Sequence, residues 1–300
     1  MKRLAGILLW IVCLTAALGA WAEGVGGDWA DLYTLEVENA VEYGDLREEW
    51  AKEPETYVPA PEGSWIQLKL EDAVLTGDIQ LVHELDAEYG ALYPQDVIPE
   101  KGGALLTSGD NESTASWKIT AEQGGLYELQ VTYLALGGNE AKVQRKITID
   151  GETPFEEANN LCFYRVFEEE VQENGKMRVN AIGDEVWPHM YEKEVWQTVR
   201  AVDQQAIYVD PLRFYLSAGE HEIALHYVDQ PIVLGEIAFA APKTYSTYSE
   251  KLAEWQAAGY KAVSEDVIIK LQAEDSAWRS ENVIRRESDA DPLTEPKSGA

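Results

Sequence analysis

The stretch from Ser116 to Tyr133 constrains the fold of this chain most, because apolar and polar residues alternate along it on both sides of Gly124-Gly125. The apolar members are Trp117, Ile119, Tyr127, Leu129, Val131 and Tyr133, and the polar members are Lys118, Thr120, Glu128, Gln130 and Thr132. A period of two with one solvated face is typical of strands in an antiparallel sandwich sheet. We therefore expect an antiparallel hairpin that turns at the two glycines.

Further strands are predicted on both sides of this hairpin. They cover residues 64–70, 141–150, 212–216, 222–228 and 232–239, and Asp150-Gly151 is a favoured pair for a tight turn. Residues 73–110 contain only short apolar runs and are predicted to be rich in loops. The chain is thus predicted to be all-β, with one sandwich over residues 60–242.

The composition is sufficient for a large hydrophobic core and argues against anionic partners. Hydrophobic residues make up 45% of the 300 residues, which is ample for a packed core. The 54 Asp and Glu residues outnumber the 24 Lys and Arg residues, so the formal net charge is −30. Such a polyanion repels nucleic acid and anionic lipid. The charge indicates a neutral or cationic partner, or serves only solubility.

Residues 1–22 have the pattern of a secretory signal peptide. Lys2 and Arg3 precede an apolar run from Leu4 to Leu18, and Ala20-Trp21-Ala22 is a cleavage site of the small-x-small type. The alternative, a membrane anchor, has fewer apolar residues than the ~20 that a spanning helix needs. We expect a secreted protein with no membrane insertion after cleavage. Cys162 is then the only cysteine, so no intrachain disulfide can form.

Two helices flank the predicted sandwich. Residues 23–59 form a helical N-terminal segment with Gly44 as a break, and residues 243–262 form a linker with a helix at 248–258. Thr247 and Glu250 make a capping box for that helix, and Gly259 stands at its C-terminal cap.

The two helices belong to an internal repeat. Tyr43-x6-Trp50 recurs as Tyr248-x6-Trp255, and the Glu-Asp pair that ends the strand after the first helix recurs after a predicted strand at 267–273. We interpret residues 263–300 as the truncated start of a second similar domain. The alternative is a chance match in a chain rich in these residues.

The order of several motifs resembles known families. Ser116-Trp117-Lys118, Gly125-Leu126-Tyr127, Ile149-Asp150-Gly151 and the segment 215–221 are similar to the galactose-binding-like jelly roll of carbohydrate-binding modules of families 6 and 35. Together with Arg165, residues 183–188 and Trp196, they make residues 40–295 resemble the N-terminal region of large extracellular solute-binding proteins of bacterial ABC transporters. The resemblance implies an antiparallel jelly-roll β-sandwich that precedes a sugar-binding domain.

The resemblance also implies a structural calcium site, from which this chain departs. Lys69 stands where a second Glu is expected, and Gly235 stands where an Asp is expected. Because a Lys ammonium competes with the ion, we expect no resident cofactor. The only candidate calcium ligands are Glu71, Asp72 and Glu236.

The aromatic insertion at residues 152–210 is the predicted location of binding. Sugar recognition needs flat aromatic faces and planar polar side chains. The candidates are Trp187, Trp196, Tyr191, Tyr164, Arg165 and Arg200. Each aromatic residue can instead pack the insertion onto the sandwich or face a neighbouring domain.

Other motifs have simpler interpretations. His221 and His226 are five apart in a strand pattern, whereas a metalloprotease helix places its histidines four apart. The run Glu168–Glu170 is interpreted as a solvated acidic turn, although it could hold a cation.

We expect that the protein has no enzyme activity and is a non-catalytic extracellular carbohydrate-binding module of an ABC-transporter solute-binding protein. The alternatives are an accessory module of a secreted polysaccharide-degrading enzyme and a purely structural interaction domain. The expected partners are a neutral carbohydrate and the adjoining domains of a longer chain.

Overall fold

The computed structural model describes residues 41–83, 103–107, 112–137, 141–170, 178–263, 267–268, 276–283, 287–288, 293 and 298–299. The predicted signal peptide, the part of the helical segment before residue 41 and most of the predicted strand at 267–273 lie outside these ranges. Among the described helices, none combines the length and the apolar composition that a membrane span requires.

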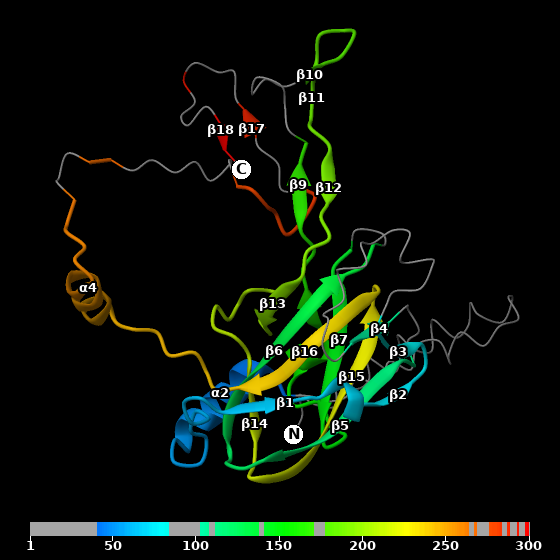
Figure 1. Cartoon of the computed structure of the whole chain (residues 1–300), viewed down its shortest axis with the longest axis vertical. Coiled ribbons are helices and arrows are strands. Elements are labelled where there is room, and N and C mark those ends of the chain that lie inside the picture. The colour runs from blue at the N-terminus through cyan, green and yellow to red at the C-terminus, as the bar shows by residue number, and fades with distance from the viewer. Residues whose placement is uncertain are drawn as a thin grey trace, which may run out of the picture. The chain divides into compact units, whose positions relative to one another are not determined.

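Two antiparallel sheets form the sandwich (Figure 1). The larger sheet runs β13-β6-β16-β4-β3, with β1 also paired to β16 and β14 to β6. Its strands are β1 (Trp65–Gln67), β3 (Ile79–Val82), β4 (Ala104–Thr107), β6 (Gly125–Ala135), β13 (Gln197–Arg200), β14 (Arg213–Leu216) and β16 (Ile232–Ala240). The smaller sheet runs β2-β5-β15-β7-β8. Its strands are β2 (Val74–Thr76), β5 (Thr114–Ala121), β7 (Val143–Ile149), β8 (Leu161–Phe163) and β15 (Gly219–Asp229). The predicted all-β antiparallel jelly-roll sandwich is confirmed.

The remaining elements are short. They are α2 (Tyr43–Lys52), η1 (Leu70–Asp72), η3 (Glu156–Asn159), α4 (Tyr248–Ala257), the paired strands β9 (Phe167–Glu169) and β12 (Met190–Glu192), β10 (Arg178–Val179) and β11 (Glu185–Val186), and β17 (Glu287–Ser288) and β18 (Ser298–Gly299).

The core is made of strand residues from both sheets. In β5, Trp117 and Ile119 are buried while Lys118 and Thr120 are exposed, as the alternation predicts. Strands β6 and β16 are buried along nearly their whole length. Burial of one large apolar side chain stabilises the fold by roughly 1.5–3 kcal/mol relative to exposure. The shared apolar cluster therefore holds the two sheets together.

The predicted hairpin at Gly124-Gly125 is wrong, although both of its strands exist. Strand β5 pairs with β2 and β15 in the smaller sheet, whereas β6 pairs with β13, β14 and β16 in the larger sheet. The chain crosses between sheets at the two glycines. A Cβ on Gly125 would lie 2.9 Å from the Ala60 Cα, so the close approach of another backbone segment explains this glycine.

The alternation predicts that Glu128 lies on a solvated face, and this prediction is also wrong. It is only 2% exposed, because β6 is covered on its second face, and its carboxylate pairs with Arg200. A polar residue in an alternating strand can therefore be buried when it has an ionic partner.

The segments predicted to lack strands contain several. Strands β2, β3 and β4 lie within 73–110, and β8 and β13 lie within the insertion at 152–210. Both β8 and β13 extend the main sheets, so much of this insertion is part of the sandwich. These strands have only three or four residues, too few for a period of two to show.

The local predictions for turns and caps are confirmed. Asp150 and Gly151 both have positive φ, and Ile149 and Glu152 exchange backbone hydrogen bonds across them. The capping box of Thr247 and Glu250 is complete. Gly44 is the second residue of α2 and not a break, and a Cβ there would lie 2.4 Å from the Tyr208 hydroxyl oxygen.

Candidate functional site

A hollow of about 620 Å³ lies between β1 and β5, and we name it the Trp65 hollow. Residues 64–67, 69 and 72 line one side, and residues 117–120, 122, 123 and 127 line the other. The volume is within the ~300–1,000 Å³ that small-ligand sites commonly have.

Two buried aromatic residues form fixed parts of its lining. Trp117 donates its indole N–H to the backbone oxygen of Lys69 over 2.9 Å, and Tyr127 donates its hydroxyl to the backbone oxygen of Gln123 over 2.7 Å. Burial raises the pKa of the Tyr127 phenol, so the hydroxyl stays protonated as a donor. The first bond joins the two sides of the hollow, and the second fixes two residues of the same side relative to each other.

The rim of the Trp65 hollow is polar and electrically balanced. The Trp65 indole is 44% exposed, and exposed amide groups of Gln67 and Gln123 lie on the same lining. Two ammonium groups, from Lys69 and Lys118, and two carboxylates, from Asp72 and Glu122, also belong to the lining. In a chain with a formal charge of −30, this local balance suits a neutral ligand.

Strand edges also border the hollow. Strand β2 pairs with β5 only along Thr114–Ser116, so Trp117–Ala121 has a strand partner on one side only within the described residues. Among the described strands, β1 likewise pairs with β16 alone. Backbone N–H and C=O groups at such edges are free to bind a polar ligand.

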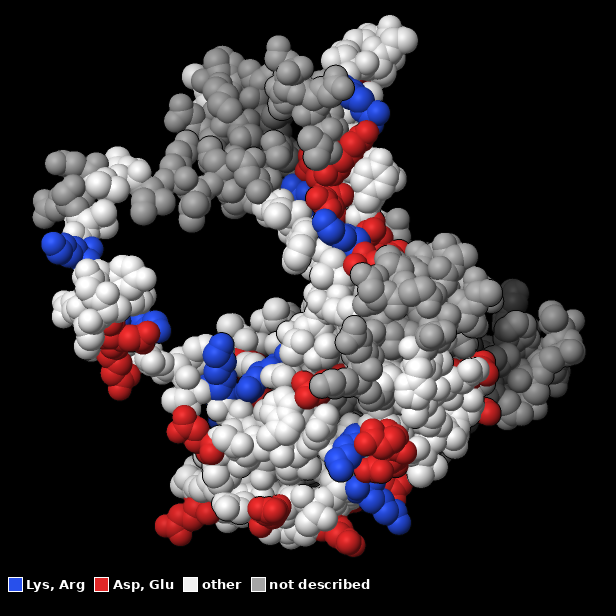
Figure 2. All heavy atoms as spheres, in the orientation of Figure 1, with Lys and Arg blue, Asp and Glu red and all other residues white. Residues whose placement is uncertain are grey.

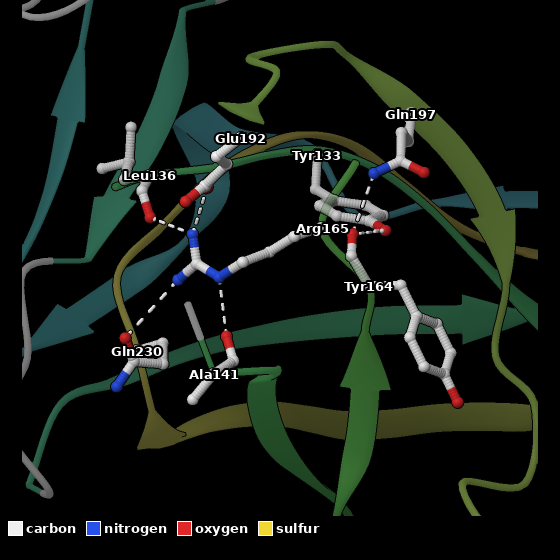
Figure 3. Close-up of polar contacts among 8 residues, drawn as sticks. All are labelled: Tyr133, Leu136, Ala141, Tyr164, Arg165, Glu192, Gln197 and Gln230. Carbon is white, nitrogen blue, oxygen red and sulfur yellow. Dashed lines mark hydrogen bonds and ion pairs between the residues drawn. The ribbon is translucent and has the colours of Figure 1, made fainter. Parts of the chain in front are cut away.

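The predicted aromatic residues fall into two groups. Trp187 and Tyr191 are 43% and 51% exposed and lie at the strand pairs that the insertion forms outside the two main sheets. Trp196 is half-buried against a small apolar cluster, where the missing side chain of Gly235 leaves room for its ring. Tyr164 is half-buried, and its backbone oxygen accepts hydrogen bonds from Tyr133 and Gln197 (Figure 3). None of these four residues lines the Trp65 hollow.

Arg165 is held inside the protein by four partners (Figure 3). Its side chain is 1% exposed and donates to the backbone oxygens of Leu136 and Ala141, to the Glu192 carboxylate and to the Gln230 amide oxygen. These four bonds join separate segments of the chain and leave the guanidinium, which has five N–H donors, little capacity for a ligand.

Arg200 also has internal partners. Its guanidinium binds the buried Glu128 carboxylate and the backbone oxygen of Ala241. We leave Arg165 and Arg200 out of the site proposed below, because their donors already serve the fold.

Charged side chains in and next to strands β9, β10 and β12 bind one another. Figure 2 shows acidic and basic atoms side by side there, and ion pairs join Lys193 to Glu168 and Arg178 to Glu170 at 2.6 and 2.8 Å. Residue Arg279 adds a backbone bridge to Phe167 and an ion pair to Glu169. The prediction of a solvated acidic turn at 168–170 is therefore wrong, because Glu168 and Glu169 lie in β9 and all three carboxylates are half-buried and paired with cations.

The predicted calcium ligands do not form a described cluster. Glu71 and Asp72 lie in η1, and Glu236 lies at an irregularity in β16, and all three are exposed. Within the described residues, no group of three or more His, Cys, Asp or Glu side chains could hold a metal. That the protein has no resident cofactor stays a prediction, with calcium at these three residues as the alternative.

Ser217, His221 and Asp150 have the connectivity of a hydrolase triad. His221 Nδ1 lies 2.7 Å from Asp150, and Nε2 lies 3.3 Å from the Ser217 hydroxyl and 2.9 Å from its backbone oxygen. Because a carbonyl oxygen only accepts, the shorter contact requires a proton on Nε2, which then cannot take one from the hydroxyl. The cluster therefore braces the turn between β14 and β15.

Asp150 is the acidic partner in this brace. Burial alone would raise its pKa, but a hydrogen bond from the backbone N–H of Glu222 and the contact with His221 together lower it. The ionised carboxylate is thus the form that the fold stabilises.

The fold and the Trp65 hollow define an antiparallel β-sandwich with a polar concave surface. No family model matches the chain, and comparison with curated proteins gives no match. Among solved structures, the chain is similar to a family 35 carbohydrate binding module from Clostridium thermocellum, with 16% identity, a TM-score of 0.34 and coverage of 60% of this chain and 100% of the module.

Two further solved structures show similarity at the same level. They are CBM35 from Paenibacillus barcinonensis, with 13% identity, a TM-score of 0.31 and coverage of 60% and 99%, and the GH26-CBM35 β-(1,4)-mannanase of Podospora anserina, with 12% identity, a TM-score of 0.35 and coverage of 61% and 29%. The chain thus spans less than a third of the mannanase. Similarity this low carries no argument about function, and the fold stands on its own strand order and register.

Proposed function

We propose that this protein is a non-catalytic extracellular module that recognises a neutral carbohydrate in the Trp65 hollow. The observation that carries the proposal is a half-exposed indole on the lining of a hollow whose rim is polar and electrically balanced. An indole face attracts the polarised C–H groups of a sugar ring, while amide, ammonium and carboxylate groups bind its hydroxyls.

The exposed rings of Trp187 and Tyr191 are the competing location. They belong to the insertion in which the sequence predicts binding, and stacking on them needs no hollow. The Trp65 hollow is favoured because it adds polar groups and shape to a stacking face, which a sugar site needs for orientation.

The test is titration of the whole chain with a panel of neutral oligosaccharides, followed in heat or tryptophan fluorescence. Trp65→Ala and Trp187→Ala are matched variants, because the two indoles are 44% and 43% exposed. Loss of one stacking partner costs about 0.5–1.5 kcal/mol beyond the buried area, so we expect at least tenfold weaker binding for Trp65→Ala and unchanged binding for Trp187→Ala.

The opposite pattern would place the site on the insertion and refute the Trp65 hollow. If no oligosaccharide binds at about 10 mM to the folded chain, the protein is better explained as a structural interaction domain. Circular dichroism and melting temperature of each variant exclude loss of fold as the cause.

The larger context of the module is also a proposal. The sequence resemblance supports a solute-binding protein of an ABC transporter, and an accessory module of a polysaccharide-degrading enzyme fits the same hollow equally well. Both contexts require sugar binding outside the cell, so the titration tests what they share.

A further inference from the structure

Helix α4 presents an aromatic face that no part of the described structure covers. Tyr248, Leu252 and Trp255 stand at positions i, i+4 and i+7, so they share one side of the helix. They are 73%, 36% and 43% exposed, and no residue of α4 is buried. Helices of ten residues are marginal without tertiary packing, so this one needs a partner surface.

Helix α2 has the same Tyr-x6-Trp spacing and is docked on the sandwich. Tyr43 and Trp50 are only 3% and 7% exposed. The Tyr43 ring lies 4.9 Å from the Phe155 ring, and its hydroxyl accepts a hydrogen bond from the backbone N–H of Arg213. Tyr43 and Trp50 therefore anchor α2 to one end of the sandwich through an aromatic contact and a hydrogen bond from a strand N–H.

A third aromatic residue extends the parallel. Trp50 packs near Tyr57 at 6.1 Å between ring centroids, and Tyr57 packs on Tyr215 at 4.9 Å. Tyr260 follows Trp255 by five residues, two fewer than separate Tyr57 from Trp50, and is 70% exposed. The sequence Glu-Asp that follows the first set also follows the second, as Glu274-Asp275. Three aromatic positions that are docked in the first copy are thus exposed in the second.

We propose that α4 and Tyr260 form a docking element for the end of a second β-sandwich of this same build. In the first sandwich, α2 covers a surface of clustered aromatic rings beside a strand N–H. We expect the second sandwich to have an equivalent surface, on which α4 docks. The predicted second domain that opens at residue 263 is the occupant. The proposal does not depend on sugar binding.

The first experiment uses this sandwich as the available example of the partner. In the whole chain carrying Tyr43→Ala and Trp50→Ala, α2 loses both anchors and the sandwich end is open. A labelled peptide of residues 244–262 is titrated into this chain and into the unmodified chain, and fluorescence anisotropy is measured. We expect saturable binding to the variant, at least tenfold weaker binding to the unmodified chain, and at least tenfold weaker binding of a peptide with Tyr248→Ala and Trp255→Ala.

Equal binding of the two peptides, equal binding to the two chains, or no binding at about 1 mM to the folded variant would overturn the proposal. Self-association of the unmodified chain that depends on Trp255 would also contradict it, by making a second copy the partner.

A second variant keeps the proposal testable if the double variant does not fold. In it, Asp45–Lys52 is exchanged for the sequence of Glu250–Ala257, while Tyr43 and Gly44 stay because a side chain at Gly44 would contact Tyr208. We expect this chain to melt at a higher temperature than the Trp50→Ala single variant. A lower melting temperature would mean that the α4 sequence is not built to dock on such an end.

Discussion

Arg165 allows a sharp test, because the structure assigns it to the fold while the sequence predicts a role in ligand binding. Substitution to Met keeps much of the side-chain volume and removes all four polar contacts. The Glu192 carboxylate, whose side chain is 19% exposed, then loses its cation, and the backbone oxygens of Leu136 and Ala141 lose a donor. Removing one partner of a buried ion pair lowers the free energy of unfolding by about 3–5 kcal/mol.

The lower end of that range applies, because Glu192 keeps some contact with water. A loss of about 3 kcal/mol in the free energy of unfolding corresponds to a fall in melting temperature of roughly 6–12 °C for a domain of this size. Chemical denaturation of Arg165→Met, Glu192→Met and the double variant gives the interaction energy. We expect the double variant to be at least ~1 kcal/mol more stable than the sum of the single effects implies, because it leaves no unpaired charge.

The assay is urea denaturation followed by tryptophan fluorescence, with sugar titration of each folded variant alongside. A loss below about 1 kcal/mol for Arg165→Met, or a double variant whose effects simply add, would refute the structural role. Loss of sugar binding in an equally stable Arg165→Met chain would return Arg165 to the ligand site.

Three further predictions concern the turn, the sheet crossing and the linker helix. Since the folded pKa of Asp150 is lowered, its contribution to stability is present above its unfolded pKa of about 3.9 and is lost as the pH falls through the folded value. Asp150→Asn should therefore lower the melting temperature at pH 7, and this difference should shrink as the pH falls below the unfolded pKa of about 3.9, so a difference that stays constant with pH would argue against the His221 brace. Gly125→Ala should destabilise the fold by about 1–3 kcal/mol, because its Cβ would meet the Ala60 backbone at 2.9 Å, and thermal melts check it against Gly151→Ala, where the cost is backbone strain alone. Thr247→Ala should remove about 1 kcal/mol of helix stability and increase amide hydrogen exchange in α4 only, so exchange that spreads to the sandwich would contradict the uncovered state of that helix.

Local chemistry made several features predictable from the sequence. The alternation around Trp117 marks both β5 and β6, the Asp150-Gly151 pair marks its tight turn, and Thr247 with Glu250 marks the start of α4. Each of these depends on residues within a few positions of one another. The signal peptide and the second domain depend on the same kind of local pattern, and they stay predictions because they lie largely outside the described residues.

The candidate site was less predictable. In the sequence, Trp65 is one residue of a predicted strand with no sign of a binding role. It becomes a site residue only because β1 and β5, from different sheets, border one hollow. The available sequence signal was that Trp65 shares its strand face with the polar residues Gln67 and Lys69, while Ile66 and Leu68 alternate with them.

Tertiary structure alone decided which strands pair and which charges are buried. Strands β5 and β6 follow one another along the chain yet lie in different sheets, because their partners β15 and β16 come from about a hundred residues further on. The buried Glu128 is likewise paired with the partly buried Arg200, which is 72 positions away in the sequence. An alternating pattern determines that a strand has an apolar face, but the choice of partner depends on contacts between distant residues, which form only when the whole sandwich closes.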